Sequence, residues 1–570
     1  MSIIGLKKAN CKNCYKCVKV CPVKSIKVED AQAQIIEKEC ILCGRCLSEC
    51  PQNAKTFYSD IDRVKDFVRN GEQVIVSLAP SYVGSFAFET CGQLIAAIQK
   101  LGIWGVSETA QGAALVSAEY FRLAKEGAMD NIITTCCPAV NDLVEKHFPA
   151  ATRYLAPVVS PMIAHGKALK QTYGAGVKVV FVGPCFAKKG EATDIRHDTC
   201  IDAVLTYDDL SGWMEDAGVD IAACSGGKFL NGDTKVTRLY PVAAGILKTI
   251  TAQGEVPQYD YICVDGVENC MDLLKAVIAG SVHHCLIEMS ACAGSCINGP
   301  AKTKHEKNRF STKLELEGSV RQEGMDFPEI AERVPMGKQF VDRSNRDALP
   351  DEAAIRAILQ KVGKETPEQE LNCGLCGYES CRAKAIAVYQ GKAELTMCIP
   401  FMRERAESMS NLILAQTPNI TVMVDSDLNI VEFNAAAEAA FGLTRAEALK
   451  KSLFELIDTT DFQYVLETKQ SIYDKKVVYE DYHLVTVQNL IYIAEENLVM
   501  GIFNDITKEE SEKENRYKLR VETLEMAQKV IDKQMTVAQQ IAGLLGETTA
   551  DTKVTLTKLK DMIVFDGEEV

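Results

Sequence analysis

The chain has 570 residues, of which 47% are hydrophobic and 25% charged, and it carries a formal net charge of −15. This length predicts several domains, and the acidic balance argues against a nucleic-acid partner, which normally requires basic patches. No signal-peptide pattern opens the sequence and no run of about 18 apolar residues occurs, so we expect a cytoplasmic protein with no membrane partner.

Cysteine is the most informative residue type. The sequence contains 23 cysteines but only seven histidines. A disulfide scaffold suits short secreted proteins, so this count predicts metal or redox chemistry with mainly thiolate ligands.

The first 60 residues contain a repeated cysteine pattern. CKNCYKCVKVCP and CILCGRCLSECP both read C-x2-C-x2-C-x3-C-P. This resembles the bacterial two-cluster ferredoxins, in which the fourth cysteine of each half ligates the cluster of the other half. The pattern predicts a ferredoxin-like α+β domain over residues 1–60, and a pair of zinc sites is the alternative. One 4Fe-4S cluster would be held by Cys11, Cys14, Cys17 and Cys50, and the other by Cys40, Cys43, Cys46 and Cys21.

Residues 61–355 alternate short apolar runs with helical stretches, which predicts an α/β domain with a largely parallel sheet. Ligands of open α/β sheets bind beyond the carboxyl ends of the strands, so cysteines that follow distant strands can converge on one cofactor. Inert burial is the alternative for a cysteine. We expect strands within 73–81, 130–138, 177–185 and 282–292, and inert burial for Cys91, Cys200, Cys224, Cys263, Cys270 and Cys285.

Four more cysteines define a module over residues 356–405. They are spaced C-x2-C-x4-C-x16-C, at Cys373, Cys376, Cys381 and Cys398. Four thiolates near tight glycine turns predict another 4Fe-4S cluster, and tetrahedral zinc uses similar spacing, so zinc is the alternative.

The chain contains no cysteine beyond residue 410. Strand-like runs around a helical insert predict a small α+β domain over residues 410–508. A heptad seam then predicts a helix within residues 509–570 that forms a homodimer, and packing against its own domain is the alternative. The seam residues are Tyr517, Val521, Leu524, Gln528, Ile531, Met535, Ala538, Ala542 and Leu545.

Three cysteine segments of the α/β domain resemble, in order and spacing, the signature segments of the FeFe hydrogenases. They are TTCCPAV, GPCFAKKGE and EMSACAGSCINGP. The resemblance implies that family's H-cluster, a 4Fe-4S cluster joined through one cysteine to a diiron unit with carbon monoxide, cyanide and a dithiolate amine. By the match, the cubane would be held by Cys137, Cys185, Cys292 and Cys296, with Cys296 bridging to the diiron unit.

The same match assigns further roles. Cys136 would relay protons to the amine, and Lys188 would donate to a cyanide. A thiol with a pKa near 8.5 can exchange a proton close to neutral pH. Ser81 and Glu119 fall where the family places other hydrogen-bonding or relay groups. The implied reaction is reversible heterolytic cleavage of H2, with a ferredoxin-type redox partner and separate maturation proteins.

The sequence departs from the family pattern around the cofactor. Val140 stands where a tryptophan is usual, and Gly183 where a methionine is usual. In the third segment Ser290 occupies the thioether position, because Met289 lies one place early. Smaller or more polar residues predict looser packing, a detuned cofactor and slow turnover.

The segment from VMVDSD to FNDITKEE resembles a PAS domain. The complete arrangement resembles the sensory, PAS-containing FeFe hydrogenases, which implies a hydrogen or redox sensor that signals to a downstream protein. One alternative is an ordinary ferredoxin-dependent hydrogenase whose C-terminal domains dock a partner. Another is an electron-transfer adaptor that never receives a diiron unit.

Overall fold

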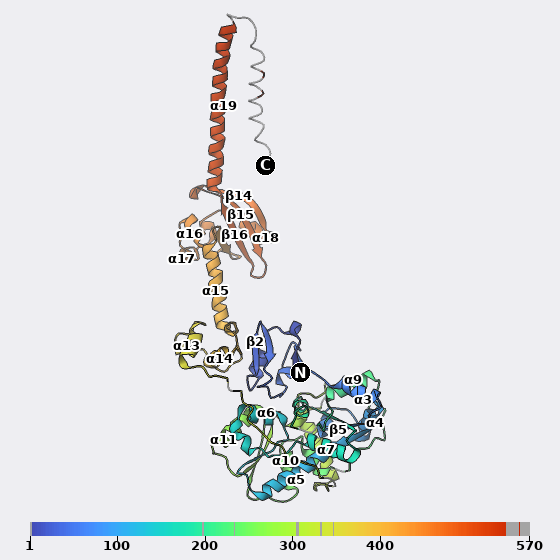
Figure 1. Ribbon diagram of the computed structural model, residues 1–570. Coiled ribbons are helices and arrows are strands. Elements are labelled where there is room, and N and C mark those ends of the chain that lie inside the picture. Colours follow the sequence, from blue (N-terminus) through green and yellow to red (C-terminus); the bar gives the residue numbers. More distant parts are fainter. Residues whose placement is uncertain are drawn as a thin grey trace. The chain divides into compact units, whose positions relative to one another are not determined.

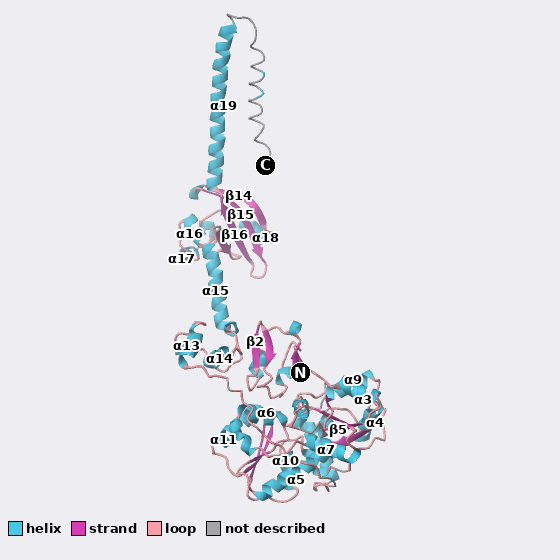
Figure 2. Cartoon of the chain, viewed as in Figure 1, coloured by secondary structure: helices cyan, strands magenta, loops and turns pink. Residues whose placement is uncertain are grey.

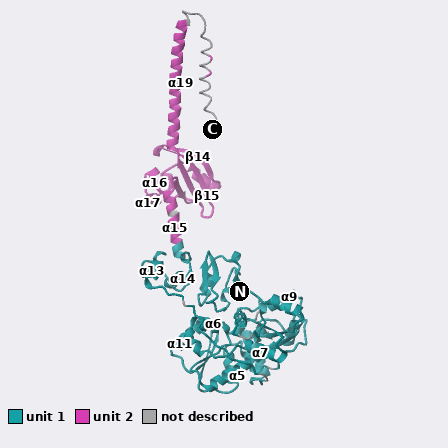
Figure 3. Ribbon diagram, viewed as in Figure 1, with its two compact units in different colours: residues 1–402 teal, residues 403–570 magenta. Residues whose placement is uncertain are grey.

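The computed structural model describes residues 3–196, 199–232, 234–303, 307–330, 333–345 and 347–542, together with 554 and 558. The chain divides into two compact units, residues 1–402 and residues 403–570 (Figure 3). Along the chain, the described elements follow the predicted order of cysteine repeat, α/β region, four-cysteine module, α+β region and long helix (Figure 1).

The N-terminal region is built from two small antiparallel strand pairs, β1 with β4 and β2 with β3. Cys17 lies in helix α1 and Cys46 in helix α2, so each half of the repeat carries its third cysteine on a short helix. The elements are β1 (Ile4–Leu6), α1 (Lys16–Val20), β2 (Ile26–Glu29), β3 (Gln32–Ile35), α2 (Arg45–Ser48) and β4 (Lys55–Phe57).

The central region contains two separate parallel sheets, where the sequence indicated only that the sheet is largely parallel. One sheet has the strand order β6-β5-β8-β9 and the other has the order β10-β11-β7. The strands are β5 (Val74–Leu78), β6 (Gly105–Glu108), β7 (Ile132–Ile133), β8 (Lys178–Gly183), β9 (Ala203–Thr206), β10 (Asp260–Asp265) and β11 (Cys285–Ser290).

Helices enclose both sheets and give each its own hydrophobic core (Figure 2). Leu94 of α4 and Met162 of α7 are buried on the four-stranded sheet, whereas Leu143 of α6 and Leu274 of α11 are buried on the three-stranded sheet. The helices are α3 (Ile61–Arg69), α4 (Cys91–Lys100), α5 (Ala110–Glu126), α6 (Pro138–His147), α7 (Pro161–Tyr173), α8 (Ala187–Ala192), α9 (Tyr207–Asp216), α10 (Gly245–Thr251), α11 (Val267–Ile278) and α12 (Arg309–Glu323).

Four strands lead directly into the predicted site segments. Ser81 follows β5 and Cys185 follows β8 in one sheet, while Cys136 follows β7 and Cys292 follows β11 in the other. The two sheets therefore deliver the site residues from the carboxyl ends of their strands, as the α/β pattern predicts.

The four-cysteine module packs on the N-terminal region. Tyr378 and Met397 of the module share one hydrophobic core with Val18 and Ile26 of the cysteine repeat. The helices of this part are α13 (Glu352–Gln360), α14 (Cys381–Tyr389) and α15 (Ile399–Gln416), and α15 begins one residue after Cys398.

The second unit contains a five-stranded antiparallel sheet of order β13-β12-β16-β15-β14. Asn434 caps helix α16, because its side chain accepts a hydrogen bond from the N–H of Ala437 at 3.0 Å. The elements are β12 (Ile420–Val424), β13 (Ile430–Phe433), α16 (Ala435–Phe441), α17 (Arg445–Ala448), α18 (Thr460–Thr468), β14 (Ile472–Tyr479), β15 (Leu484–Ile493), β16 (Leu498–Asp505) and α19 (Thr507–Ala542).

Helix α19 carries the predicted heptad seam. Tyr517 is 70% exposed and Val521 is 37% exposed in the single chain. Leu545, the last predicted seam residue, lies outside the described residues. None of the helices in the described part of the chain combines the length and apolar character that a bilayer span needs.

Candidate functional site

The structure gathers most of the predicted site residues around one cavity in the central region. The cavity has a volume of about 70 Å³, and its lining includes Ser81, Cys136, Cys185, Lys188 and Cys296. Most other lining groups are apolar, among them Ala110, Met162, Phe181 and Pro241. The site therefore places three thiols and one ammonium group at an apolar space beyond the carboxyl ends of the strands.

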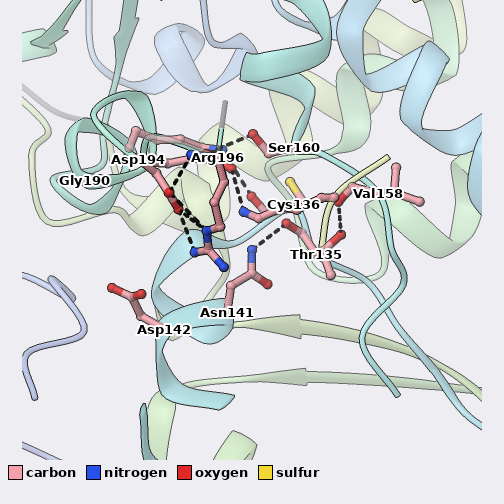
Figure 4. Close-up of polar contacts among 12 residues, drawn as sticks. Thr135, Cys136, Asn141, Asp142, Val158, Ser160, Gly190, Asp194 and Arg196 are labelled. Atoms are coloured by element: carbon pink, nitrogen blue, oxygen red, sulfur yellow. Dashed lines mark hydrogen bonds and ion pairs between the residues drawn. The ribbon is translucent and has the colours of Figure 1, made fainter. Parts of the chain in front are cut away.

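A hydrogen-bond network fixes the turn that carries the paired cysteines (Figure 4). The hydroxyl of Thr135 donates to the carbonyl of Val158 at 2.7 Å, and the Asn141 amide donates to the carbonyl of Thr135 at 2.9 Å. Cys137 is the N-cap of α6 and Pro138 occupies its first turn, where a missing N–H costs nothing. From this turn, Cys136 packs against the core of the four-stranded sheet and Cys137 packs against the core of the three-stranded sheet.

Lys188 is held by a buried carboxylate. Its ammonium group donates to Glu191 Oε2 at 2.8 Å and to the carbonyl oxygen of Cys136 at 3.2 Å. The hydroxyl of Ser160 donates to the same carboxylate at 2.9 Å. Burial alone would lower the pKa of Lys188, but Glu191 raises it overall, so the ammonium group remains charged beside the cavity.

The thiol environments fit a metal cluster. Burial raises the pKa of Cys185 to about 11, and neighbouring Cys137 adds to the shift. Burial raises the pKa of Cys292 and Cys296 further, and each of these two is also raised by the other site thiols. Repulsion among Cys185, Cys292 and Cys296 in their charged forms would be relieved by bound iron, because a metal ion deprotonates its thiol ligands.

The pKa of Cys136 differs from the value of an ordinary cysteine thiol. Burial raises the pKa of this thiol to about 12, although Lys188 partly opposes the shift. Cys136 is therefore a protonated donor at neutral pH, rather than a group that titrates there.

The second half of the cysteine repeat docks directly on this site. Gly44 adopts φ +78°, and a Cβ at this position would lie 2.6 Å from Phe186 and 2.8 Å from Pro300. The neighbouring Arg45 forms an ion pair with Glu268. Cys43 is close enough for its charge to raise the pKa of Cys292. Cys21 likewise affects the pKa of Cys43, which fits their assignment to one cluster.

Ser81 and Glu119 have different surroundings. Ser81 lines the cavity, and its hydroxyl lies 2.8 Å from the hydroxyl of Tyr207, which itself donates to the carbonyl of Ala79. Ser81 therefore donates to Tyr207. Glu119 is not among the cavity residues, and its carboxylate pairs with Arg122 at 2.6 Å on α5.

The glycine of the second segment does not open the pocket. A Cβ on Gly183 would lie 2.7 Å from the ring of Phe181, which fills this space and lines the cavity. Val140 is fully buried in the core of the three-stranded sheet. The looser packing expected from the small residue at position 183 is therefore not present.

Strand alternation explains the shifted methionine. Met289 and Ile287 belong to the core of the three-stranded sheet, whereas Leu286, on the other face of β11, belongs to the core of the four-stranded sheet. Successive side chains of a strand point to opposite faces, so a shift of one residue removes the thioether from the cavity. Ser290 lies 3.1 Å from the hydroxyl of Ser295, the residue before Cys296.

Sequence reasoning did not identify the buried carboxyl group of Glu288. Glu288 is 1% exposed, and its Oε2 accepts hydrogen bonds from the N–H groups of Ile246 at 3.0 Å and Leu247 at 3.1 Å. Burial raises its pKa to about 7. Its Oε1 has no hydrogen-bond partner among the described protein groups. The only sequence signal was a lone acidic residue inside an apolar strand.

Glu288 is close enough to Cys136 to influence the pKa of its thiol, which the charge of Glu288 raises. In the parallel pairing of β10 with β11, Glu288 lies opposite Cys263, whose exposure contradicts the inert burial expected from the sequence. Cys91, Cys200, Cys224, Cys270 and Cys285 are buried or partly buried.

A second cavity lies in the four-cysteine module. It measures about 30 Å³, and its lining includes Cys373, Cys376, Cys381 and Cys398. Lys384 also lines it, is 5% exposed, and donates to the carbonyl of Leu395 at 2.9 Å. Burial raises the pKa of Tyr378, and the neighbouring Cys376, Cys21 and Glu39 raise it further, so its hydroxyl keeps its proton.

The fold and these thiol sites define an iron–sulfur protein with a cofactor pocket in an α/β domain. Residues 72–300 match the profile of the iron-only hydrogenase large subunit, C-terminal domain, so the chain carries this hydrogenase domain. Residues 3–51 match a 4Fe-4S dicluster domain and residues 408–506 match the PAS fold. Residues 369–400 match the profile described as "Putative Fe-S cluster".

Individual relatives are distant. The NADP-reducing hydrogenase subunit HndD of Solidesulfovibrio fructosivorans is 26% identical over 338 residues, which is 48% of this chain and 57% of that protein. The nuclear prelamin A recognition factor of Danio rerio is 23% identical over 440 residues, covering 61% of this chain and 92% of that protein. The chain spans 57% to 63% of the length of the first three curated hydrogenase relatives.

Solved FeFe hydrogenases are also similar. The enzyme of Chlamydomonas reinhardtii aligns with a TM-score of 0.39 and 16% identity, covering 50% of this chain and all of that chain.

Proposed function

We propose that this protein binds an H-cluster and converts H2 reversibly to protons and electrons at low turnover, as part of a hydrogen or redox sensor. The observation that carries the proposal is the apolar cavity lined jointly by Cys136, Cys185, Lys188 and Cys296. When bound, the H-cluster would supply an open iron position and an amine base for heterolytic cleavage of H2.

The protein's own groups would have distinct roles. Cys137, Cys185, Cys292 and Cys296 would hold the cubane. Lys188, kept charged by Glu191, would present a fixed donor to an anionic ligand in a cavity that excludes water. Cys136, protonated in this environment, would hold the proton nearest the cavity.

Protons would leave through Glu288. Its pKa of about 7 suits a group that accepts and releases a proton near neutral pH, and its Oε1 is available for a hydrogen bond. The exposed Cys263 lies opposite it on β10. Glu119, paired with Arg122 away from the cavity, has no part in this route. A single carboxyl relay of this kind is consistent with slow turnover.

Electrons would pass through three further 4Fe-4S clusters. The cluster of Cys21, Cys40, Cys43 and Cys46 would lie next to the active site, because Cys43 affects the pKa of Cys292. Cys21, the ligand that the first half would contribute to this cluster, shares a core with Tyr378 and Met397 of the four-cysteine module. The module would therefore receive electrons from this cluster, and the cluster of Cys11, Cys14, Cys17 and Cys50 would serve a ferredoxin or another redox partner.

The signal would leave through the helices around the PAS domain. Cys398 is followed immediately by α15, which leads to β12, and β16 leads into α19. A change of charge at the module's cluster would act on α15 through its ligand Cys398. The exposed seam of α19 would form a homodimer and present the output to a downstream protein in the cytoplasm.

Infrared spectroscopy of the anaerobically matured protein tests the cofactor. Carbonyl and cyanide bands that shift reversibly between hydrogen and argon are the expected result. A protein with loaded cubanes and no such bands would contradict the proposal and favour the electron-transfer adaptor.

Limited proteolysis tests the sensory role. Reduction under hydrogen should change the protection of residues 510–542 against proteases. Identical digestion patterns under hydrogen and argon, together with rapid turnover, would favour the ordinary ferredoxin-dependent hydrogenase.

A further inference from the structure

Tyr378 carries a buried hydroxyl group whose purpose the fold alone does not explain. The residue is 4% exposed, and its ring packs in the core shared by the module and the cysteine repeat. Its hydroxyl oxygen has no hydrogen-bond partner among the described groups. A buried polar group without a partner costs free energy, and phenylalanine would fill the same space without that cost.

The hydroxyl group lies beside sulfur ligands. Tyr378 lines the small cavity of the module together with all four of its cysteines. The thiols that act most strongly on it are Cys376 of the module and Cys21 of the repeat. The cofactor proposed for this cavity therefore brings acceptor sulfur atoms to the place where an acceptor is lacking.

Other polar groups around this cavity already have partners in the protein. Lys364 donates to the carbonyl of Gln369 at 2.8 Å, and Lys384 donates to the carbonyl of Leu395 at 2.9 Å. The side-chain oxygen of Asn372 accepts from the N–H of Cys381, and that of Ser380 accepts from the N–H of Ala383. Tyr378 differs from them because its hydroxyl group has no hydrogen-bond partner among the described residues.

The position of Tyr378 is fixed by the junction between the module and the repeat. The preceding Gly377 adopts φ +90°, and a Cβ there would lie 3.0 Å from both the backbone N of Lys19 and a methyl group of Val18. Lys24 donates to the carbonyl of Gly377 at 2.9 Å. The N–H of Val28 donates to the carbonyl of Lys392 at 3.0 Å. These contacts hold the ring of Tyr378 between the four-cysteine module and the cysteine repeat.

We propose that Tyr378 donates a hydrogen bond to a sulfur atom of the cluster held by Cys373, Cys376, Cys381 and Cys398, and so favours electron transfer to it from the Cys21 cluster. This rests on the proposed iron–sulfur loading of the module. A hydrogen bond to an anionic acceptor strengthens as negative charge increases, so it stabilises the reduced cluster more than the oxidised one. Tyr378 is thus a positioning residue that acts on the electron transfer through its hydrogen bond to the cluster, and its own protonation need not change.

An EPR-monitored redox titration of the full-length, cluster-loaded protein tests this role. Tyr378→Phe keeps the ring and removes the donor. Tyr389→Phe is the matched control, because Tyr389 belongs to the same module but is 50% exposed. We expect Tyr378→Phe to weaken electron uptake by the module's cluster about tenfold, which equals about 59 mV for one electron. Tyr389→Phe should leave the potential unchanged.

The cluster of Cys11, Cys14, Cys17 and Cys50 serves as an internal reference in each variant. Equal potentials of the module's cluster in the unmodified protein and in Tyr378→Phe would overturn the proposal. An equal iron content in Cys381→Ser and in the unmodified protein would also overturn the proposal, because the module would then hold no cluster. The infrared bands of the diiron unit report separately on the proposed hydrogenase function, and they do not depend on Tyr378.

Discussion

Replacing Glu288 with glutamine should remove a large pH dependence of stability. The carboxyl group has a pKa of about 7 in the folded protein, against an ordinary value of 4.5. The difference of about 2.5 pH units, at ~1.36 kcal/mol per unit, corresponds to about 3 kcal/mol. Below pH 4.5 the group is protonated in both states and costs nothing. As the pH rises to 7, the unfolded carboxyl group ionises while the buried one resists, so the free energy of unfolding falls.

The assay is urea unfolding of the cluster-loaded chain between pH 5 and pH 8. Both tryptophans, Trp104 and Trp213, belong to the central region, so their fluorescence follows the region that contains Glu288. Glutamine retains an oxygen that can accept from Ile246 and Leu247, which limits the change to the loss of the ionisable proton. We expect the unmodified protein to lose stability with rising pH, and Glu288→Gln to lose much less.

Glu119→Gln is the matched control, because it changes a surface ion pair worth at most about 1 kcal/mol. Hydrogen-dependent proton exchange should fall by about 100-fold in Glu288→Gln and remain near normal in Glu119→Gln. The reasoning is refuted if Glu288→Gln keeps the unmodified pH slope, or if Glu119→Gln alone reduces the exchange rate.

Three further predictions concern the other groups of the protein. Cys136→Ala should keep the infrared bands but lower turnover by at least ~100-fold, whereas Cys200→Ala, which is not part of the cavity lining, should be active; equal rates would exclude the thiol as a proton carrier. Lys188→Met removes the cation from a buried ion pair and should lower the free energy of unfolding by about 3–5 kcal/mol in urea; a loss below ~1 kcal/mol would contradict the importance of this pair. Leu524→Asp should convert the proposed dimer to a monomer in sedimentation, while Leu519→Asp, off the seam and 65% exposed, should not; an unchanged mass in both would mean that α19 does not form the interface.

The local spacing of the cysteines predicted the thiolate sites without knowledge of the fold. The doubled C-x2-C-x2-C-x3-C-P pattern and the later four-cysteine pattern lie where profiles for iron–sulfur domains match. The α/β alternation also predicted strands that end near Ser81, Cys136 and Cys185. The cysteines of one half of the repeat lie within a few residues of each other, so the local sequence is enough to predict them as ligands.

Longer-range features escaped the sequence. The expectation of a loose pocket at Gly183 was wrong because Phe181, two residues earlier, fills the space. Glu119 matched a family position, yet α5 turns it toward Arg122. The roles of Glu288 and Tyr378 depend on which groups surround them. The spacing of residues in the sequence does not reveal that a buried polar atom has no hydrogen-bond partner.

The sequence by itself indicated the iron–sulfur domains, the order of the regions and the candidate thiol ligands. Only the tertiary structure decided that two sheets bring Cys136, Lys188 and Cys296 to one cavity. It also decided that the second half of the cysteine repeat contacts this site, whereas the first half contacts the four-cysteine module. The reason is physical. Ligation depends on residue type and local spacing, whereas burial, pKa and electron routes depend on distances between segments far apart in the chain.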